Sequence, residues 1–230
     1  MSHELKIVKT DDGSNTIYNA EVGENYHSKH GALQESRHVF VNAGLKYFLE
    51  RTLAGTTVSI LEVGFGTGLN FLLSADLCTE RKIVLDYTGI EAYPLSHEMI
   101  GQTGYDQYLP VELWTNFINE YHAGLINPIS LNSYSKLQIA SCKLLNFQSK
   151  QQYDIIYFDA FAVARQPEMW DEKAISHTLQ FLKPGGVFVT YAITGNLKRA
   201  LKALGCKVEK APGAPGKREM LRAVKPVPLI

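Results

Sequence analysis

Apolar and polar positions follow two alternating spacings along the chain. Short apolar runs bounded by turn residues predict strands, whereas apolar residues three or four positions apart predict helices. The expected strands are 57–63, 82–90, 136–141, 153–159 and 186–192, and the expected helices are 69–79, 95–101, 110–124, 169–182 and 196–204. Strands that alternate with helices in this way form a mostly parallel sheet with helices on both faces.

The two ends of the chain depart from this alternation. Residues 206–210 and 217–224 predict two strands, and the short proline- and glycine-rich connection between them requires an antiparallel hairpin. Near the start, residues 5–20 predict another β-hairpin, and 35–53 has the apolar spacing of a helix. We therefore predict an α/β, Rossmann-like fold with a mostly parallel seven-stranded sheet and an antiparallel closing hairpin.

A glycine-rich turn joins the strand at 57–63 to the following helix. The segment is Gly64-Phe65-Gly66-Thr67-Gly68, and glycines at such a turn permit a tight bend and close approach of a ligand. A nicotinamide or flavin fingerprint would place glycine at position 69, which is Leu69, and the Lys-Ser/Thr of a P-loop is also missing. With Glu62 two residues before the first glycine, the segment resembles the S-adenosyl-L-methionine (SAM) loop of methyltransferases. The alternative is a turn without a ligand.

Other residues that predict a cofactor site stand at strand ends, where ligands bind in doubly wound sheets. The Glu91 carboxylate can accept hydrogen bonds from both ribose hydroxyls, although an ordinary surface acid is the alternative. Many SAM enzymes have an acid after the strand equivalent to 136–141, but this chain has Ser141, so we expect backbone groups or Ser141 to hold adenine. The predicted cofactor-binding residues are Glu62, Gly64, Phe65, Gly66, Gly68, Asn70, Glu91, Ala92, Ser141, Cys142 and Asp159.

Asp159 and Phe161 are the predicted catalytic residues. Asp159 ends the apolar strand 153–159, and an ionised acid at such a place needs a partner or a function. An alkyl amine with a pKa near ~10.4 is neutral only about once in 2,000 molecules at pH 7, yet methyl transfer requires the neutral form. Asp159 can orient the amine and take its proton, and Phe161 can shield it and face the cationic methyl group. The alternative is that Asp159 only caps a turn.

Composition fits a main domain at 55–230 with an extension at 1–54 packed on it. The chain has 230 residues, 45% of them hydrophobic, and no apolar run of membrane length; its start does not resemble a signal peptide, so we expect a cytoplasmic protein. Three widely spaced cysteines argue against disulfides and structural zinc. The histidines at 27, 30 and 38 lack metal-ligand spacing, and no metal is predicted.

Charge is distributed unevenly, although the net charge is zero. Residues 196–230 contain nine basic residues against Glu209 and Glu219, so this segment carries +7 and the remainder −7. A basic segment of this kind can form a phosphate-binding face. A solvated helix and strand edge is an equally good explanation from composition alone.

Taken together, these residues make the chain resemble the methyltransferase half of the MnmC family, which modifies the wobble uridine of bacterial tRNA. The resemblance spans nearly the whole chain. Its most specific blocks are Glu35-Ser36-Arg37-His38-Val39-Phe40 and Lys217-Arg218-Glu219-Met220-Leu221, and it includes Phe158-Asp159-Ala160-Phe161.

The resemblance implies SAM-dependent N-methylation of the exocyclic amine of 5-aminomethyl(-2-thio)uridine in tRNA. It also implies substrate contacts by Tyr26, Ser28, Glu35, Tyr191, Lys217 and Arg218, the last two with tRNA phosphates. Many members carry a fused FAD-dependent oxidoreductase; we expect a stand-alone methyltransferase, which leaves a separate oxidoreductase or other modification enzyme open as a partner. Two alternatives remain: a small-amine methyltransferase or polyamine-type aminopropyl transferase, and a SAM-binding module without chemistry.

Overall fold

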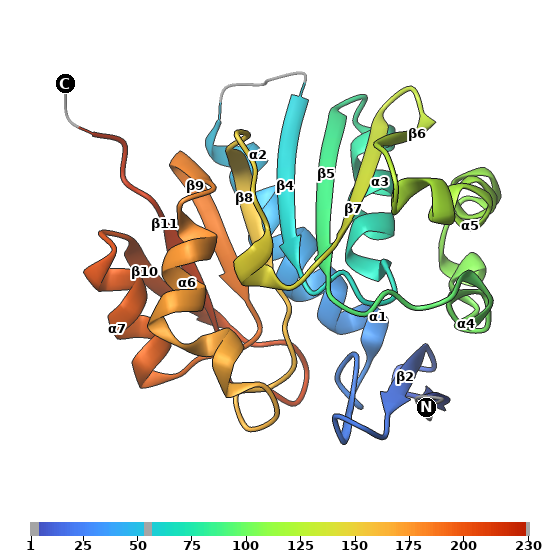
Figure 1. Ribbon diagram of the computed structural model, residues 1–230, viewed down its shortest axis with the longest axis horizontal. Helices are drawn as coiled ribbons and strands as arrows, with labels where there is room; N and C mark the ends of the chain where they lie inside the picture. Colours follow the sequence, from blue (N-terminus) through green and yellow to red (C-terminus); the bar gives the residue numbers. More distant parts are fainter. Residues whose placement is uncertain (1–4, 53–56, 229–230) are drawn as a thin grey trace.

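An eight-stranded sheet forms the centre of the computed structural model, which describes residues 5–52 and 57–228 (Figure 1). Its order is β10-β11-β9-β8-β4-β5-β7-β6. The strands are β4 (Thr57–Val63), β5 (Val84–Glu91), β6 (Ile129–Asn132), β7 (Ser135–Ser141), β8 (Tyr153–Phe158), β9 (Leu182–Thr190), β10 (Lys207–Pro212) and β11 (Glu219–Val224). The five strands from β9 to β7 are parallel, whereas β11 and β6 are antiparallel to their neighbours.

The predicted α/β fold with a closing hairpin is confirmed, and the sheet has one strand more than the seven expected. The additional strand, β6, has only four residues, which are too few to form a distinct apolar run. Its register with β7 is irregular. The helix expected at 169–182 is shorter. A 3₁₀ turn at Pro167–Trp170 precedes α6 (Glu172–Leu179), whose first turn is capped by the Asp171 carboxylate.

Helices cover both faces of the sheet and enclose two apolar clusters. One cluster involves α3 (Leu69–Glu80) and α5 (Val111–Gly124), and the other involves α6 and α7 (Gly195–Ala203). Strand β4 shows the alternation, because Val58 and Ile60 belong to the first cluster and Leu61 and Val63 to the second. The shorter helical elements on the α5 side are α4 (His97–Gly101) and the 3₁₀ turn Tyr105–Tyr108, and the turn Leu144–Asn146 follows β7.

The N-terminal part consists of a three-stranded sheet followed by a continuous helix. The strands are β1 (Leu5–Lys9), β2 (Asn15–Asn19) and β3 (Glu24–Asn25), and the helix runs through α1 (Ala32–Glu35), the π-helix η1 (Ser36–Lys46) and α2 (Tyr47–Arg51). A Cβ at Gly44 would lie 2.9 Å from the Tyr157 ring, so η1 packs closely on the central sheet. The expected boundary between residues 54 and 55 falls outside the described residues.

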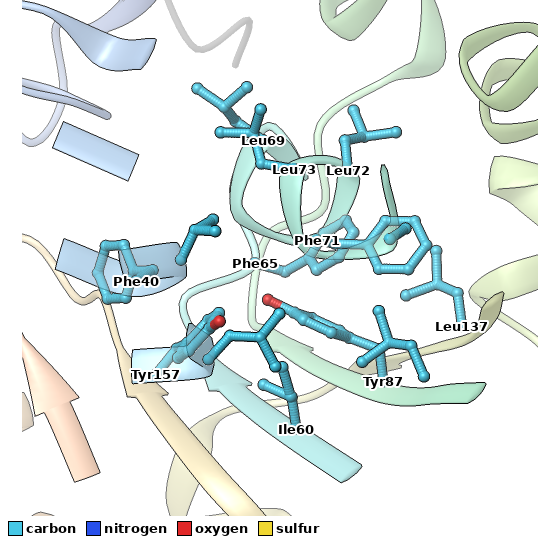
Figure 2. Packing of buried hydrophobic residues seen from close by; sticks show 14 of the residues in the cluster. Phe40, Ile60, Phe65, Leu69, Phe71, Leu72, Leu73, Tyr87, Leu137 and Tyr157 are labelled. Atoms are coloured by element: carbon cyan, nitrogen blue, oxygen red, sulfur yellow. The ribbon is translucent and has the colours of Figure 1, made fainter. Parts of the chain in front are cut away.

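The first apolar cluster extends directly beneath the glycine-rich turn (Figure 2). Phe65, within that turn, is 3% exposed and lies 6.3 Å from Phe71, which in turn makes an edge contact of 5.1 Å with Tyr87. On the other side of the cluster, Phe40 of η1 packs on Tyr157 with ring centroids 5.1 Å apart. The turn is therefore anchored in the core through its own aromatic side chain.

Candidate functional site

A cavity of about 1530 Å³ opens beyond the carboxyl ends of β4, β5 and β8. Three parts of the chain line it: the glycine-rich turn with the neighbouring strand ends, the N-terminal part, and the connection between β10 and β11. The predicted residues that line it are Tyr26, Ser28, Glu35, Gly64, Phe65, Gly66, Asn70, Glu91, Ala92, Cys142, Asp159, Phe161, Tyr191 and Lys217. Glu62, Gly68, Ser141 and Arg218, also predicted, are not among the lining residues.

Gly64 allows the turn after β4 to lie against the end of β8. Its φ is +87°, and a Cβ there would lie 2.4 Å from the Asp159 carbonyl oxygen. The Asp159 backbone N–H donates to the Val63 carbonyl over 2.8 Å, which holds the two segments together. The glycine at position 64 thus fixes where Asp159 begins its turn into the cavity.

Glu91 connects β5 to the glycine-rich turn. Its two carboxylate oxygens accept backbone N–H groups, Oε2 from Gly66 over 2.9 Å and Oε1 from Tyr93 over 3.0 Å. Each oxygen keeps a second lone pair, which a ribose hydroxyl can use. Burial raises the pKa of Glu91, while these two hydrogen bonds act in the opposite direction. The carboxylate is therefore held in place at the cavity wall.

Asn70 bridges two carboxylates with one amide group. Its Nδ2 donates to Glu62 Oε1 over 2.7 Å and to Asp159 Oδ2 over 2.8 Å. Glu62 is fully buried and also accepts from the Tyr87 hydroxyl over 2.8 Å, so it braces the turn. Burial, followed by the charge of Asp159, raises the pKa of Glu62 well above its usual range.

The remaining polar atom of this bridge, Asn70 Oδ1, is buried and has no hydrogen-bond partner among the described residues. Buried acceptors normally have a donor, so an unpartnered one beside a cavity indicates a place for a ligand N–H. The amine of the methionine part of SAM is such a donor. Together with the glycine backbone and the Glu91 carboxylate, this acceptor makes the cavity chemically suited to SAM.

Asp159 lies at the junction between the glycine-rich turn and the aromatic end of the cavity. Its pKa is raised to about 8, first by burial and then by the charge of Glu35, while the Asn70 hydrogen bond and the Lys217 charge lower it. Phe161, two residues on, makes an edge contact with the Tyr26 ring at 5.1 Å. An acid with a pKa raised to about 8 therefore lines the same cavity as two aromatic rings that contact each other.

Backbone hydrogen bonds hold the segment after Asp159 in place. The Trp170 indole donates to the Phe161 carbonyl over 2.8 Å, and the Ala162 N–H donates to Glu24 Oε2 over 3.0 Å. The Tyr191 hydroxyl donates to the Ala160 carbonyl over 2.8 Å. Glu24 and Trp170 were not predicted from sequence; Glu24 lies 138 positions from Ala162, whereas Trp170 lies nine positions from Phe161.

Lys217 joins the two ends of the described chain across the cavity. Its ammonium lies 2.6 Å from Glu35 Oε1 and 3.9 Å from the centroid of the Tyr191 ring. Glu35 Oε2 also accepts the Ser28 backbone N–H over 2.7 Å. Lys217, predicted to contact a phosphate, forms this ion pair at the cavity wall, and Arg218, predicted to do the same, is exposed.

The cavity wall beyond β5 and β7 includes residues that sequence analysis missed. Tyr93, 64% exposed, and the segment 143–146 line this part, next to Cys142, whereas Ser141 is exposed and outside the lining. Their position directly after strand ends was the available signal. Among the described residues, no cluster suits a metal ion and no helix is long and apolar enough to span a membrane.

Residues 112–226, half of the chain, match a family model described as "S-adenosyl-L-methionine-dependent methyltransferase". Curated relatives include the tRNA 5-methylaminomethyl-2-thiouridine biosynthesis bifunctional protein MnmC of Methylobacillus flagellatus, 30% identical over 219 residues, covering 89% of this chain and 33% of that protein. The protein of the same name from Leptospira interrogans is 31% identical over 205 residues, covering 85% and 32%. This chain therefore spans about a third of the length of these relatives.

Two solved structures share the fold. MNMC2 from Aquifex aeolicus superimposes with a TM-score of 0.76 at 24% identity, covering 100% of this chain and 73% of that one. DesVI from Streptomyces venezuelae gives a TM-score of 0.51 at 12% identity, covering 84% of this chain and 92% of that one. At these identities the two comparisons support the Rossmann-like architecture of the chain.

Proposed function

The chain belongs to the family of S-adenosyl-L-methionine-dependent methyltransferases, and on that premise we propose that it methylates a modified uridine in tRNA. The target is the exocyclic amine of 5-aminomethyl(-2-thio)uridine at the wobble position, and the product is 5-methylaminomethyl(-2-thio)uridine. The names of the curated relatives point to this product. The structural observation that supports it most directly is the single cavity that joins the glycine-rich turn to Asp159 and Phe161.

Bound SAM supplies an electrophilic methyl group carried on a positively charged sulfur. The residues that would hold it are Gly64 and Gly66 through their backbone, Glu91 at the ribose and Asn70 Oδ1 at the amine. Glu62 would position Asn70 without contacting SAM itself, since it accepts a hydrogen bond from the Asn70 amide and is held by the Tyr87 hydroxyl. Held by these residues, SAM would occupy the part of the cavity that Asp159 also lines.

Asp159 would orient the substrate amine and accept the proton that nitrogen loses during methylation. A general base works best when its pKa is near the operating pH, and the value of about 8 for Asp159 meets this condition. A cation bound next to the carboxylate favours its charged form and lowers that pKa. The positive charge of bound SAM would therefore favour the ionised form of Asp159, which is the form that accepts a proton.

The aromatic side chains would exclude water from the amine. Phe161 and Tyr26 form one wall, and Tyr191 with the Lys217–Glu35 ion pair forms another. Aromatic faces also attract cationic groups, which suits an onium methyl group and the amine that receives it. This arrangement separates a methyl-transfer site from a module that only binds SAM.

The size of the cavity favours a nucleoside over a small amine. Sites for drug-sized ligands are about 300–1,000 Å³, so about 1530 Å³ leaves room for a second ligand beside the cofactor. Enzymes that act on a base commonly take the nucleotide out of its stack and into such a pocket. A small-amine methyltransferase or an aminopropyl transferase would have no use for this additional volume.

The test uses labelled SAM, the purified protein and two tRNA pools, one from cells that stop at the 5-aminomethyl stage and one fully modified. We expect label only in the first pool, in the wobble nucleoside, and little or none with Asp159→Ala, which should still bind SAM. A panel of small amines serves as the competing substrate class. Label in a small amine, with none in either tRNA pool, would replace this proposal by the small-amine alternative.

We further propose that the protein acts in the cytoplasm and receives its 5-aminomethyl substrate from a separate enzyme. The curated relatives are named as bifunctional proteins, and the chain spans about a third of their length. Purified protein that methylates the 5-aminomethyl pool without any addition would support this division of labour. A requirement for a second protein before label enters that pool would contradict it.

A further inference from the structure

A second hollow of about 440 Å³ lies outside the cavity, between α7 and β10. We call it the basic groove. Its lining residues are Gly195, Lys198, Arg199 and Lys202 from α7 with Val208 and Lys210 from β10. Four of these six residues have cationic side chains, so the groove is a concentrated positive surface. Figure 1 shows α7 beside β10 at one end of the sheet.

The fold turns these cations outward. Leu197 and Leu201 are fully buried beneath α7, which leaves Lys198, Arg199 and Lys202 on the solvent side. Like charges four positions apart destabilise a helix by a few tenths of a kcal/mol, and Lys198 and Lys202 have this spacing. The helix dipole favours Lys202, which lies in the last turn of α7, but it gives no reason for Lys198 or Arg199, whereas an anionic ligand does.

The basic groove holds three of the six cations in the basic segment 196–230 that form no ion pair among the described residues, the other three being Lys207, Arg218 and Lys225. Elsewhere in that segment Lys217 pairs with Glu35 and Arg222 with Glu209, and Lys225 donates to backbone carbonyls. Among the described residues, no acidic side chain lies within ion-pair distance of the three α7 cations, although Arg199 donates to the Asn196 side chain. Within the groove, Lys210 is paired with Glu219 over 3.0 Å, and both are partly exposed.

The basic groove lies on the same side of the sheet as the cavity. Tyr191 of the cavity wall directly follows β9, and Thr194, three residues later, caps α7. From the other direction, Lys210 is near the end of β10, and the connection that follows contains the cavity residues Gly216 and Lys217. A long ligand that enters the cavity can therefore continue over the groove.

We propose that the basic groove binds the phosphodiester backbone of the RNA whose modified uridine enters the cavity. This inference rests on the proposed function for the identity of the RNA. Three to four cations in a row match a chain of phosphates, whose counterions are released on binding. A membrane surface fits less well, because a lipid-binding helix presents large apolar side chains beside its cations, and half-buried Val208 is the one apolar side chain among the six lining residues.

The experiment measures binding of an unmodified anticodon stem-loop RNA by fluorescence anisotropy at several salt concentrations. The groove variant is K198Q/R199Q/K202Q, and the control is R81Q/K136Q/K150Q, three exposed cations near the amino ends of β5, β7 and β8. Losing three phosphate contacts should reduce the slope of log K against log salt by about 2 to 3 and weaken binding at least tenfold. The control variant should bind like the wild type, and all three proteins should bind SAM equally.

The outcomes separate the groove from the proposed function. If the groove variant keeps the wild-type slope and affinity, or if the wild type binds anionic vesicles and no RNA, the groove proposal is overturned. RNA binding that depends on the groove, without methylation of 5-aminomethyl tRNA, would leave the groove standing and refute the proposed function. If the groove variant methylates 5-aminomethyl tRNA with an unchanged KM, the proposed function would stand and the groove proposal would be refuted.

Discussion

Replacing Gly64 by alanine tests whether the glycine-rich turn positions Asp159. The new Cβ would lie 2.4 Å from the Asp159 carbonyl oxygen, so the two backbones must separate by at least 0.6 Å to reach the 3.0 Å below which real Cβ contacts essentially do not occur. A left-handed conformation costs about 1–2 kcal/mol for alanine, and overpacking adds about 1–3 kcal/mol. The expected loss is therefore about 2–5 kcal/mol of unfolding free energy.

Two other glycines provide matched controls. Gly13 and Gly205 have φ of +86° and +83°, close to the +87° of Gly64, but a Cβ at either would meet nothing within 4 Å. Gly13→Ala and Gly205→Ala should therefore cost only the conformational part, about 1–2 kcal/mol. At roughly 2–4 °C per kcal/mol for a chain of this size, the melting temperature should fall by about 4–20 °C for Gly64→Ala and by about 2–8 °C for the controls.

Gly64→Ala should differ from the two control variants more in the rate of methyl transfer than in the free energy of unfolding. A displacement near 1 Å at a reacting group can cost about 100-fold in rate, so we expect Gly64→Ala to lower kcat by roughly 10- to 100-fold. Thermal unfolding, calorimetric titration with SAM and methyl-transfer assays on 5-aminomethyl tRNA measure the three quantities. If Gly64→Ala matches the controls in stability, SAM affinity and kcat, the steric argument is refuted.

Three further substitutions test the groups around Asp159. Asp159→Asn should retain SAM binding within a few-fold while methyl transfer falls about 10²- to 10⁴-fold. Because folding raises the pKa of the Asp159 carboxyl to about 8, the wild type loses stability as pH rises from about 4 to 8. The variant should lose less stability in that window. Equal pH dependence of the two melting curves would contradict the assignment. Asn70→Ala removes a hydrogen bond that lowers the pKa of Asp159, so the acidic limb of the pH–rate profile should move to higher pH; an unmoved limb would show that this bond does not act on the base. Lys217→Met should lower the free energy of unfolding by about 1–3 kcal/mol, because it leaves the nearly buried Glu35 carboxylate without its ammonium partner. A double-mutant cycle with Glu35→Gln should show a coupling energy of at least ~0.5 kcal/mol. Additive effects in that cycle would mean that the ion pair contributes nothing to the fold.

The features that could be predicted from sequence are those with a local signature. The apolar run Val58–Val63 is buried on both faces of the sheet, which is why it predicts a strand, and the glycine spacing after it marks a ligand-binding turn. Strand β6 was missed because four residues are too few to show a period. The helix expected at 35–53 is present, but the π-helical form of its central part was not predicted, because the buried residues of η1 include the three- and four-residue spacings of an ordinary helix.

The contacts that complete the site could not be predicted, because the partners lie far apart in sequence. Lys217 and Glu35 are 182 positions apart, and Asn70 and Asp159 are 89 apart. The sequence marks each of these residues as a candidate for the site, but it does not indicate which of them are partners. Only the topology of the sheet, which brings the carboxyl ends of β4 and β8 together, places the Asn70 amide against the Asp159 carboxylate.

The ion pair between Lys217 and Glu35 also has a consequence for how the protein acquires its activity. This contact closes a loop of 182 positions, and contacts between residues so far apart in sequence form slowly. The His38 ring, which lies 2.8 Å from the Pro212 carbonyl oxygen, spans a similar separation of 174 positions. The sheet can therefore form before the cavity is closed, and recovery of methyl transfer during refolding should lag behind recovery of secondary structure.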